Sequence, residues 1–156
     1  MPFMVDAAQT AGVEDIDVKK MKISLLAFTG HKGLFGPPGT GGLYMEGNIT
    51  VRPLRYGGTG SRAEFGYQPD FRPDKLESGT PNTPVIAGLL AGVRFVRRTG
   101  PAPIGNWEKL LASQLRRRLS ELRGIKIYGP EADEERTAVV SFAGGGRDRR
   151  ERAELK

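Results

Sequence analysis

The chain has no cysteine and only one histidine among its 156 residues. Without cysteine it can form neither a disulfide nor a thiolate metal site, which is typical of a cytoplasmic protein. It also lacks an apolar run approaching the roughly 20 residues that a membrane-spanning helix needs, and no signal peptide is visible. We therefore expect a soluble, cytoplasmic protein with no membrane partner.

Acidic residues are too few to balance the basic ones, since 18 Asp and Glu face 24 Lys and Arg, for a formal net charge of +6. A basic chain can bind nucleic acid, but that requires the charge to gather on one face. Here the arginines are spread or lie on one late helix, where Arg116 to Arg118 form a solvated face opposite the leucines. We therefore expect no nucleic-acid partner.

Short apolar runs alternate with segments of helical periodicity, a pattern that predicts the α/β class. The strands are predicted at residues 3–5, 24–28, 41–45, 125–128 and 137–142. The helices are predicted at 17–22, from Pro84 to Gly100, and at 106–123. A domain boundary near residue 100 would leave one domain at 1–100 and a second at 101–156.

The stretch from residue 24 to residue 42 reads SLLAFTGHKGLFGPPGTGG. Its apolar run ends at Phe28 and is followed at once by Thr29, His31 and Lys32, and then by a loop rich in glycine and proline. Ligands of open α/β sheets gather outside the carboxyl ends of the strands. This placement predicts a ligand site, and our hypothesis is that Lys32 carries an aldehyde cofactor.

A pyridoxal phosphate site needs a lysine for the Schiff base, a carboxylate that keeps the pyridine nitrogen protonated, and donors for the ring oxygen and the phosphate. Asp6, directly after the first predicted strand, is the candidate carboxylate, and Gln9 is the candidate donor to the ring oxygen. Thr29 and His31 can hydrogen-bond the phosphate, and Lys32 is the Schiff-base amine. Each residue alone has a structural explanation, such as a loop cap or a solvated side chain. The conjunction of all five favours a cofactor site.

The segment GPPGTGG at residues 36–42 is similar to a phosphate-binding Walker loop, G-x-x-x-x-G-K-[ST]. Gly42 stands where that loop has its lysine, and Leu43 stands where it has its magnesium-binding hydroxyl. Without these two groups the loop cannot support nucleotide hydrolysis. We interpret it as a rigid turn that leads the chain away from Lys32.

Four stretches read VDAAQTAG at 5–12, FTGHKGLFGPPGTGGLY at 28–44, RYGGTGSRAEF at 55–65 and ESGTPNTPVIAGL at 77–89. They resemble the class V aminotransferase superfamily of fold-type I pyridoxal phosphate enzymes, and most closely its cysteine desulfurase branch. The resemblance spans about residues 3–142, and D-x-x-Q followed by [ST]-x-H-K is highly specific. It implies the C-terminal part of a large mixed-sheet domain, followed by part of a small α+β C-terminal domain.

The resemblance implies contacts to pyridoxal phosphate in the roles given above, made by Asp6, Gln9, Thr29, His31 and Lys32. It also implies that Thr80 reaches the phosphate held by the other subunit of a homodimer. The implied reaction converts L-cysteine to L-alanine and leaves the sulfur as an enzyme persulfide, which a sulfur-acceptor protein would receive.

The cysteine and the substrate-binding arginine of that family lie beyond the region matching Lys156. Ser24 stands where an aspartate is usual, and residues 144–156 depart from the family's helix. We therefore expect a fragment of a longer protein, inactive by itself. Another class V aminotransferase, a selenocysteine lyase and a truncated chain with no independent function are the alternatives.

Overall fold

The computed structural model describes residues 1–58 and 64–144, and the chain divides into two compact units, Met1–Arg98 and Thr99–Lys156. The charged tail at 145–156 and the central part of the RYGGTGSRAEF stretch lie outside the described residues. Each unit is considered by itself below.

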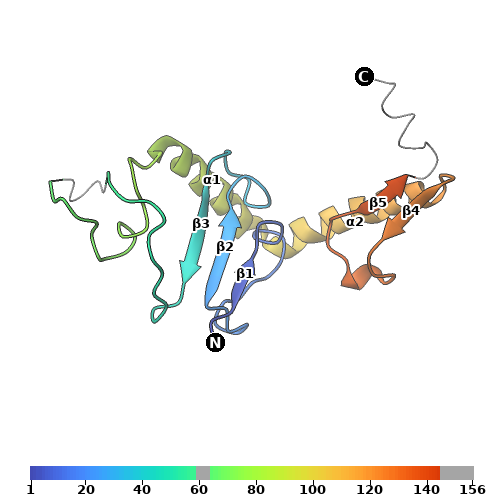
Figure 1. Ribbon diagram of the computed structural model, residues 1–156. Coiled ribbons are helices and arrows are strands. Elements are labelled where there is room, and N and C mark those ends of the chain that lie inside the picture. The colour runs from blue at the N-terminus through green and yellow to red at the C-terminus, as the bar shows by residue number, and fades with distance from the viewer. Residues whose placement is uncertain (59–63, 145–156) are drawn as a thin grey trace, which may run out of the picture. The chain divides into compact units, whose positions relative to one another are not determined.

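A three-stranded sheet organises the first unit (Figure 1). Its strands are β1 (Met4–Asp6), β2 (Leu25–Thr29) and β3 (Gly41–Met45), in the order β1-β2-β3. β1 and β2 are parallel, whereas β2 and β3 are antiparallel. The third strand has its predicted bounds, and the first two begin and end one residue later than predicted. Asp6 and Thr29 are therefore the last residues of their strands.

The core of this unit is small and lies beside β1 and β2. Its buried members are Ala7, Ile23 and Leu26, and partly buried hydrophobic side chains pack around them. The helix predicted at 17–22 is wrong. Asp17 does cap a turn, since its Oδ1 accepts hydrogen bonds from the amides of Lys19 and Lys20, but Lys22 adopts a left-handed φ of 54°. The chain turns there because Ile23 has to enter the core.

The helix α1 (Thr83–Thr99) packs against the loop that follows β2. It begins as predicted, and Asn82 Oδ1 accepts a hydrogen bond from the amide of Val85. A Cβ atom on Gly92 would lie 2.2 Å from the carbonyl oxygen of Leu34, so the backbones of helix and loop are in direct contact. The rings of Phe35 and Phe95 meet edge to face, with centroids 5.2 Å apart. The helix thus supports the loop from one side.

The second unit contains α2 (Pro101–Ser120), β4 (Ile125–Tyr128), a short 3₁₀ helix η2 (Asp133–Glu135) and β5 (Ser141–Gly144). β4 and β5 form an antiparallel pair. α2 begins five residues before its predicted start, because the prolines after Gly100 fall in the first turn, where a missing N–H costs little. β5 begins four residues after its predicted start.

Arg116 does not belong to the solvated face on which it was predicted. Its side chain is only 11% exposed and donates to the carboxylate of Asp133, which also accepts a hydrogen bond of 3.0 Å from Ser113 Oγ. These contacts join α2 to η2. Arg117 and Arg118 are exposed, as predicted.

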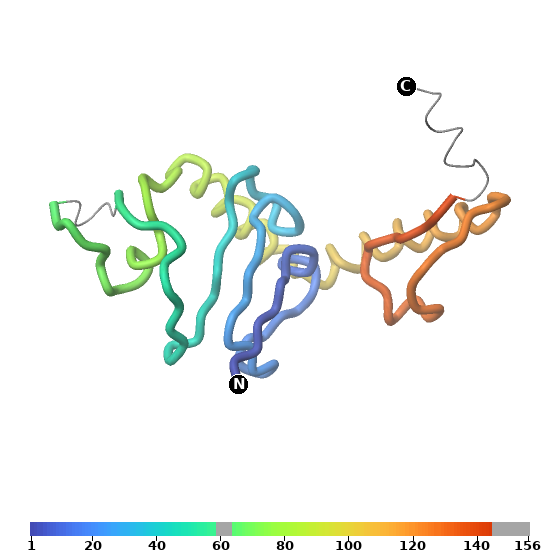
Figure 2. The backbone as a smooth tube through the Cα atoms, viewed as in Figure 1, coloured from blue at the N-terminus to red at the C-terminus, as the bar shows by residue number. Residues whose placement is uncertain are grey.

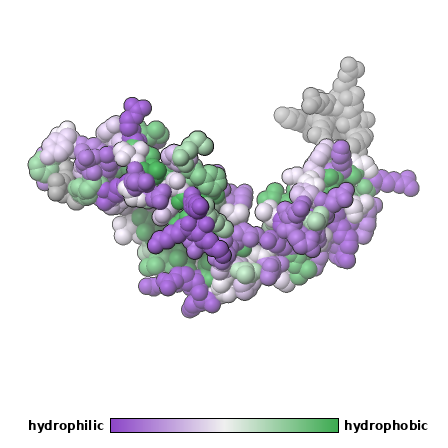
Figure 3. All heavy atoms as spheres, turned by 90° about the horizontal axis from the view of Figure 1, so that it is seen from below, coloured by the Kyte–Doolittle hydropathy of each residue, from purple (hydrophilic) through white to green (hydrophobic). Residues whose placement is uncertain are grey.

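Large hydrophobic side chains lie at the surface of both units (Figure 3). Leu54 is 97% exposed in the first unit, and Trp107 is 61% exposed in the second. Within residues 1–58 and 64–144, no helix is long and apolar enough to cross a membrane.

The contacts of Asp133 make its titration a measurable property of the second unit. The hydrogen bond from Ser113, together with Arg116, lowers the pKa of Asp133 from its ordinary value of 3.8. A carboxyl pKa that is lower in the folded chain than in the unfolded chain stabilises the fold at higher pH, and this contribution is lost as the pH falls through the folded-state value. We expect Ser113→Ala to raise the pKa of Asp133, as followed by NMR titration of the carboxyl carbon. Ser120→Ala, on the same helix but bonded to the carbonyl of Arg117, is the control and should leave it unchanged.

Candidate functional site

Two candidate side chains meet at the carboxyl edge of the parallel strands β1 and β2. Asp6 Oδ1 accepts a hydrogen bond of 2.9 Å from the amide of Ala8, and Thr29 Oγ1 donates one of 3.4 Å to the carbonyl of the same residue. The amide of Ala7 continues the ladder to the carbonyl of Ala27 at 2.8 Å. The carboxylate and the hydroxyl are therefore fixed relative to each other through the backbone of Ala8.

The loops after β1 and β2 are in direct backbone contact at this edge (Figure 2). A Cβ atom on Gly12 would lie 2.2 Å from the carbonyl oxygen of Gly33, and one on Gly33 would lie 2.7 Å from the carbonyl oxygen of Ala11. No side chain can fit between the two loops. The contact places the loop that carries Lys32 against the turn that follows Asp6.

His31 and Lys32 are exposed on a loop that its own hydrogen bonds close. The amide of Gly30 donates to the carbonyl of Thr40 at 2.8 Å, and the amide of Gly36 donates back to the carbonyl of Gly30 at 2.7 Å. The carbonyl of Lys32 accepts from the amide of Phe35 at 2.9 Å. The backbone that presents the imidazole and the amine is therefore held from within the loop as well as by α1.

Gln9 is exposed in the turn that follows β1. The amides of Thr10 and Ala11 both donate to the carbonyl of Ala7 and so define this turn. Five of the six predicted site residues consequently lie at one sheet edge, either at the ends of β1 and β2 or on the loops that follow them. Thr80 is exposed on the segment that precedes α1, and no hydrogen bond among the described residues links it to the other five.

The segment that is similar to a Walker loop forms a closed turn. Thr40 Oγ1 donates to the carbonyl of Pro37 at 2.7 Å, and Gly39 adopts a φ of 82°. The chain then enters β3 directly. This geometry agrees with the interpretation of the segment as a turn.

The backbone of Ala8 joins the side chains of Asp6 and Thr29. No feature of the sequence predicts this role of Ala8. Ala8 acts through its N–H and C=O groups, which every non-proline residue possesses. Only the pairing of Asp6 with Ala27, and with it the register of the two strands, brings Ala8 to this place.

A family model described as aminotransferase class-V matches residues 1–155. The chain belongs to the class-V aminotransferase family. Enzymes of this family depend on pyridoxal phosphate, and the sequence prediction of this family and cofactor is confirmed.

Relatives named as cysteine desulfurases cover most of this chain. A probable cysteine desulfurase of Pyrococcus abyssi is 40% identical over 144 residues, which are 90% of this chain and 36% of that protein. A second, from Methanothermobacter thermautotrophicus, is 35% identical over 81% of this chain and 33% of that protein. This chain thus spans about a third of the length of these curated relatives.

Solved structures of cysteine desulfurases share the fold. The apo structure of the enzyme from Thermococcus onnurineus NA1 matches with a TM-score of 0.73 and 33% identity, over 98% of this chain and 39% of that chain. The structure of CsdA from Escherichia coli matches with a TM-score of 0.78 and 28% identity, over 99% of this chain and 39% of that chain. The predicted fold is confirmed as a mixed α/β part of the pyridoxal phosphate-dependent transferase fold.

The residues at the sheet edge fit this cofactor chemically. They offer an amine, a carboxylate, an amide, a hydroxyl and an imidazole, which are the groups that a pyridine ring, an aldehyde and a phosphate require. The anchoring of Asp6 and Thr29 on Ala8 and the glycine contact between the loops bring these groups to the same edge.

The glycine contact can be tested separately from the backbone angle that accompanies it. Gly12 and Gly39 both have a positive φ, but a Cβ atom on Gly39 would meet nothing within 4 Å. Gly39→Ala should therefore cost only the strain of the angle, about 1 kcal/mol. We expect Gly12→Ala to cost about 1–3 kcal/mol more, because the loops must also separate. Free energies of unfolding from urea titration would measure the difference, and equal costs would contradict a tight contact.

Proposed function

We propose that this chain is the lysine-bearing part of a pyridoxal phosphate-dependent cysteine desulfurase. The observation that carries the proposal is the common edge of β1 and β2, where Asp6 and Thr29 are both bonded to Ala8 and the loop of Lys32 lies against the same turn. The relatives named as cysteine desulfurases support the choice of reaction within the family.

Each candidate residue has a role in this proposal. Lys32 holds the aldehyde carbon, and Asp6 faces the pyridine nitrogen, whose proton its negative charge retains. Gln9 donates to the ring oxygen. Thr29 and His31 hydrogen-bond the phosphate. The exposure of His31 and Lys32 leaves both side chains accessible to a bound group.

When bound, pyridoxal phosphate supplies an aldehyde that captures the amine of an amino acid and a ring that accepts negative charge. Lys32 would hold the aldehyde carbon, and its amine is the group of this chain that would move the proton of the substrate Cα atom. The carboxylate of Asp6 stays fixed by the amide of Ala8 during this transfer. The proposed substrate is L-cysteine, and a thiolate outside these 156 residues would take its sulfur, since the chain contains no cysteine.

The proposal extends to an assembly. In a cytoplasmic homodimer Thr80 would donate to the phosphate held by the other subunit, and a sulfur-acceptor protein would receive the persulfide sulfur. The exposure of Thr80 on an irregular segment supports such a contact.

Trapping of the aldehyde tests the lysine assignment. The chain is incubated with pyridoxal phosphate, reduced with borohydride and digested, and the labelled peptides are mapped by mass spectrometry. We expect one dominant label on Lys32, reduced at least about tenfold in Lys32→Ala, because a site that binds the phosphate raises the local aldehyde concentration. Lys20→Ala, which removes another exposed lysine, is the control and should keep the label. A label spread evenly over the surface lysines would contradict the assignment.

Substitution of Asp6 tests the partner of the pyridine nitrogen. Asp6→Asn retains the oxygen that accepts from the amide of Ala8 and removes only the charge. We expect the turnover of cysteine by the full-length protein to fall about a hundredfold, because the loss of a facing charge lowers the pKa of the pyridine nitrogen by about two units. Asp15→Asn, at another exposed carboxylate, should leave turnover unchanged. Unaltered turnover in Asp6→Asn would mean that this carboxylate does not face the nitrogen.

A further inference from the structure

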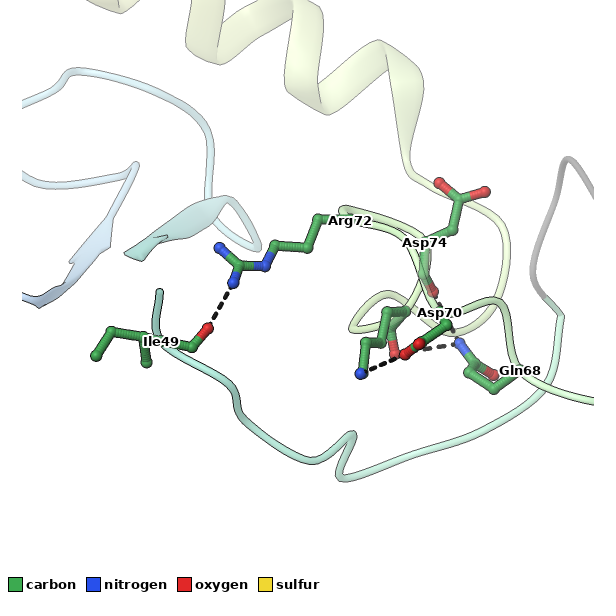
Figure 4. Close-up of polar contacts among 6 residues, drawn as sticks. Ile49, Gln68, Asp70, Arg72 and Asp74 are labelled. Atoms are coloured by element: carbon green, nitrogen blue, oxygen red, sulfur yellow. Dashed lines mark hydrogen bonds and ion pairs between the residues drawn. The ribbon is translucent and has the colours of Figure 1, made fainter. Parts of the chain in front are cut away.

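The side chain of Gln68 bonds to two separate parts of an irregular region in the first unit, at Gly57 and at residues 74–75. Figure 4 shows its contact with Asp74. Its Oε1 accepts a hydrogen bond of 3.1 Å from the amide of Gly57, and its Nε2 donates to the carbonyls of Asp74 at 2.8 Å and Lys75 at 3.3 Å. Gln68 is half-buried, and each of these three partners is a backbone group. Gln68 therefore fixes backbone where no helix or strand does so.

Gly57 passes this restraint on to the residue before Thr80. Its amide is held by Gln68, and its carbonyl accepts a hydrogen bond of 3.2 Å from the amide of Gly79. The next residue, Gly58, lies so close that a Cβ atom on it would be 2.9 Å from the Cα atom of Gly79. Hydrogen bonds and backbone packing thus run without a break from Gln68 to Gly79, the residue before Thr80.

The turn at Gly79 needs such a restraint. Gly57, Gly58 and Gly79 all have positive φ angles, of 96°, 60° and 87°. Glycine has more backbone freedom to lose than any other residue, so a turn built from three of them is poorly defined without outside contacts. The contacts of Gln68 and Gly57 supply the definition.

Other contacts hold the same segment but do not lead to Thr80. Arg72 donates to the carbonyl of Ile49, and Lys75 forms an ion pair with Asp70, whose pKa it lowers (Figure 4). The ion-paired carboxylate of Asp70 is largely exposed, so this pair contributes little. The path to Gly79 therefore begins at Gln68.

We propose that Gln68 is a positioning residue, which acts through Gly57 and Gly79 to hold the hydroxyl of Thr80 where it can donate to a phosphate group. This inference rests on the proposed function, in which Thr80 contacts the phosphate of the cofactor. It adds a residue that touches neither the cofactor nor the substrate.

Amide hydrogen exchange of the full chain without cofactor tests the path itself. Gln68→Met keeps the length of the side chain and removes all three hydrogen bonds. We expect the amides of Gly57 and Gly79 to exchange about tenfold faster, because lost hydrogen bonds permit local opening. Gln114→Ala, at an exposed glutamine of α2, is the control and should change neither amide. Faster exchange at Gly57 with no change at Gly79 would overturn the proposal.

A second variant covers the case in which Gln68→Met unfolds, as judged by circular dichroism. Gln68→Glu keeps an oxygen for the amide of Gly57 and removes the two donations to Asp74 and Lys75. We expect both Gly57 and Gly79 to exchange faster in Gln68→Glu, because the side chain is no longer held at Asp74 and Lys75, and unchanged exchange at Gly79 would overturn the proposal. Independent changes at the two amides would contradict the path.

Binding of pyridoxal phosphate tests the effect on Thr80. Thr80→Ala and Gln68→Met (or Gln68→Glu, if Gln68→Met is unfolded) should each weaken binding of pyridoxal phosphate to the apo form of the full-length protein about tenfold, as expected for one hydrogen bond to a charged group. The double variant should bind no more weakly than Thr80→Ala. Additive losses would mean that Gln68 acts independently of Thr80. If the unaltered protein forms no adduct at Lys32, the proposed function fails, whereas the exchange rates still decide whether Gln68 orders the turn.

Discussion

The first unit depends on a contact between two loops whose backbones approach each other directly. The absence of a Cβ atom at Gly12 and Gly33 lets the turn after β1 lie directly on the loop after β2. The parallel pairing of the strands brings the two loops to the same edge, and the glycines then determine how closely they pack. The backbone contact therefore places the loop that carries Lys32 against the turn that follows Asp6.

The sequence predicted the elements of this arrangement better than their ends. The strand at Gly41–Met45 and the start of α1 at the Asn82–Pro84 cap follow from local patterns, and both are confirmed. β1 and β2 extend one residue further because the ladder between the strands, a long-range interaction, decides where each ends. The helix predicted at 17–22 had a sound cap in Asp17, but the cap closes only a turn because Ile23 must reach the core.

The chemical groups of the candidate site could be predicted from the sequence, but the contacts that hold them in place could not. A carboxylate, a hydroxyl and an amine after neighbouring strands suggested a cofactor edge, yet nothing in the composition identified Ala8 as their common anchor. Arg116 was likewise not predictable. The helical pattern places it on the solvent-exposed face, but its side chain is held by the carboxylate of Asp133, which lies 17 positions away in the sequence. Contacts between irregular segments have no period, and so they leave no pattern in the sequence. Gln68 is the clearest case. Its three partners are backbone groups, and they lie up to 11 positions away in the sequence.

A site geometry that is fixed by backbone has a consequence for divergence within the family. The contact between the two loops requires a residue without a Cβ atom at Gly12 and Gly33, and the side chains of Val13 and Leu34 lie beside it. Packing between side chains is different, because each change of volume is transmitted to its neighbours. The chain shares its fold, at a TM-score of 0.73, with an enzyme to which it is 33% identical. The cost of this arrangement is concentrated in a few glycines, which have to adopt and hold angles that other residues avoid. At Gly57 and Gly79 no strand or helix restrains the backbone angles. There a single side chain with several backbone partners, that of Gln68, restrains them instead.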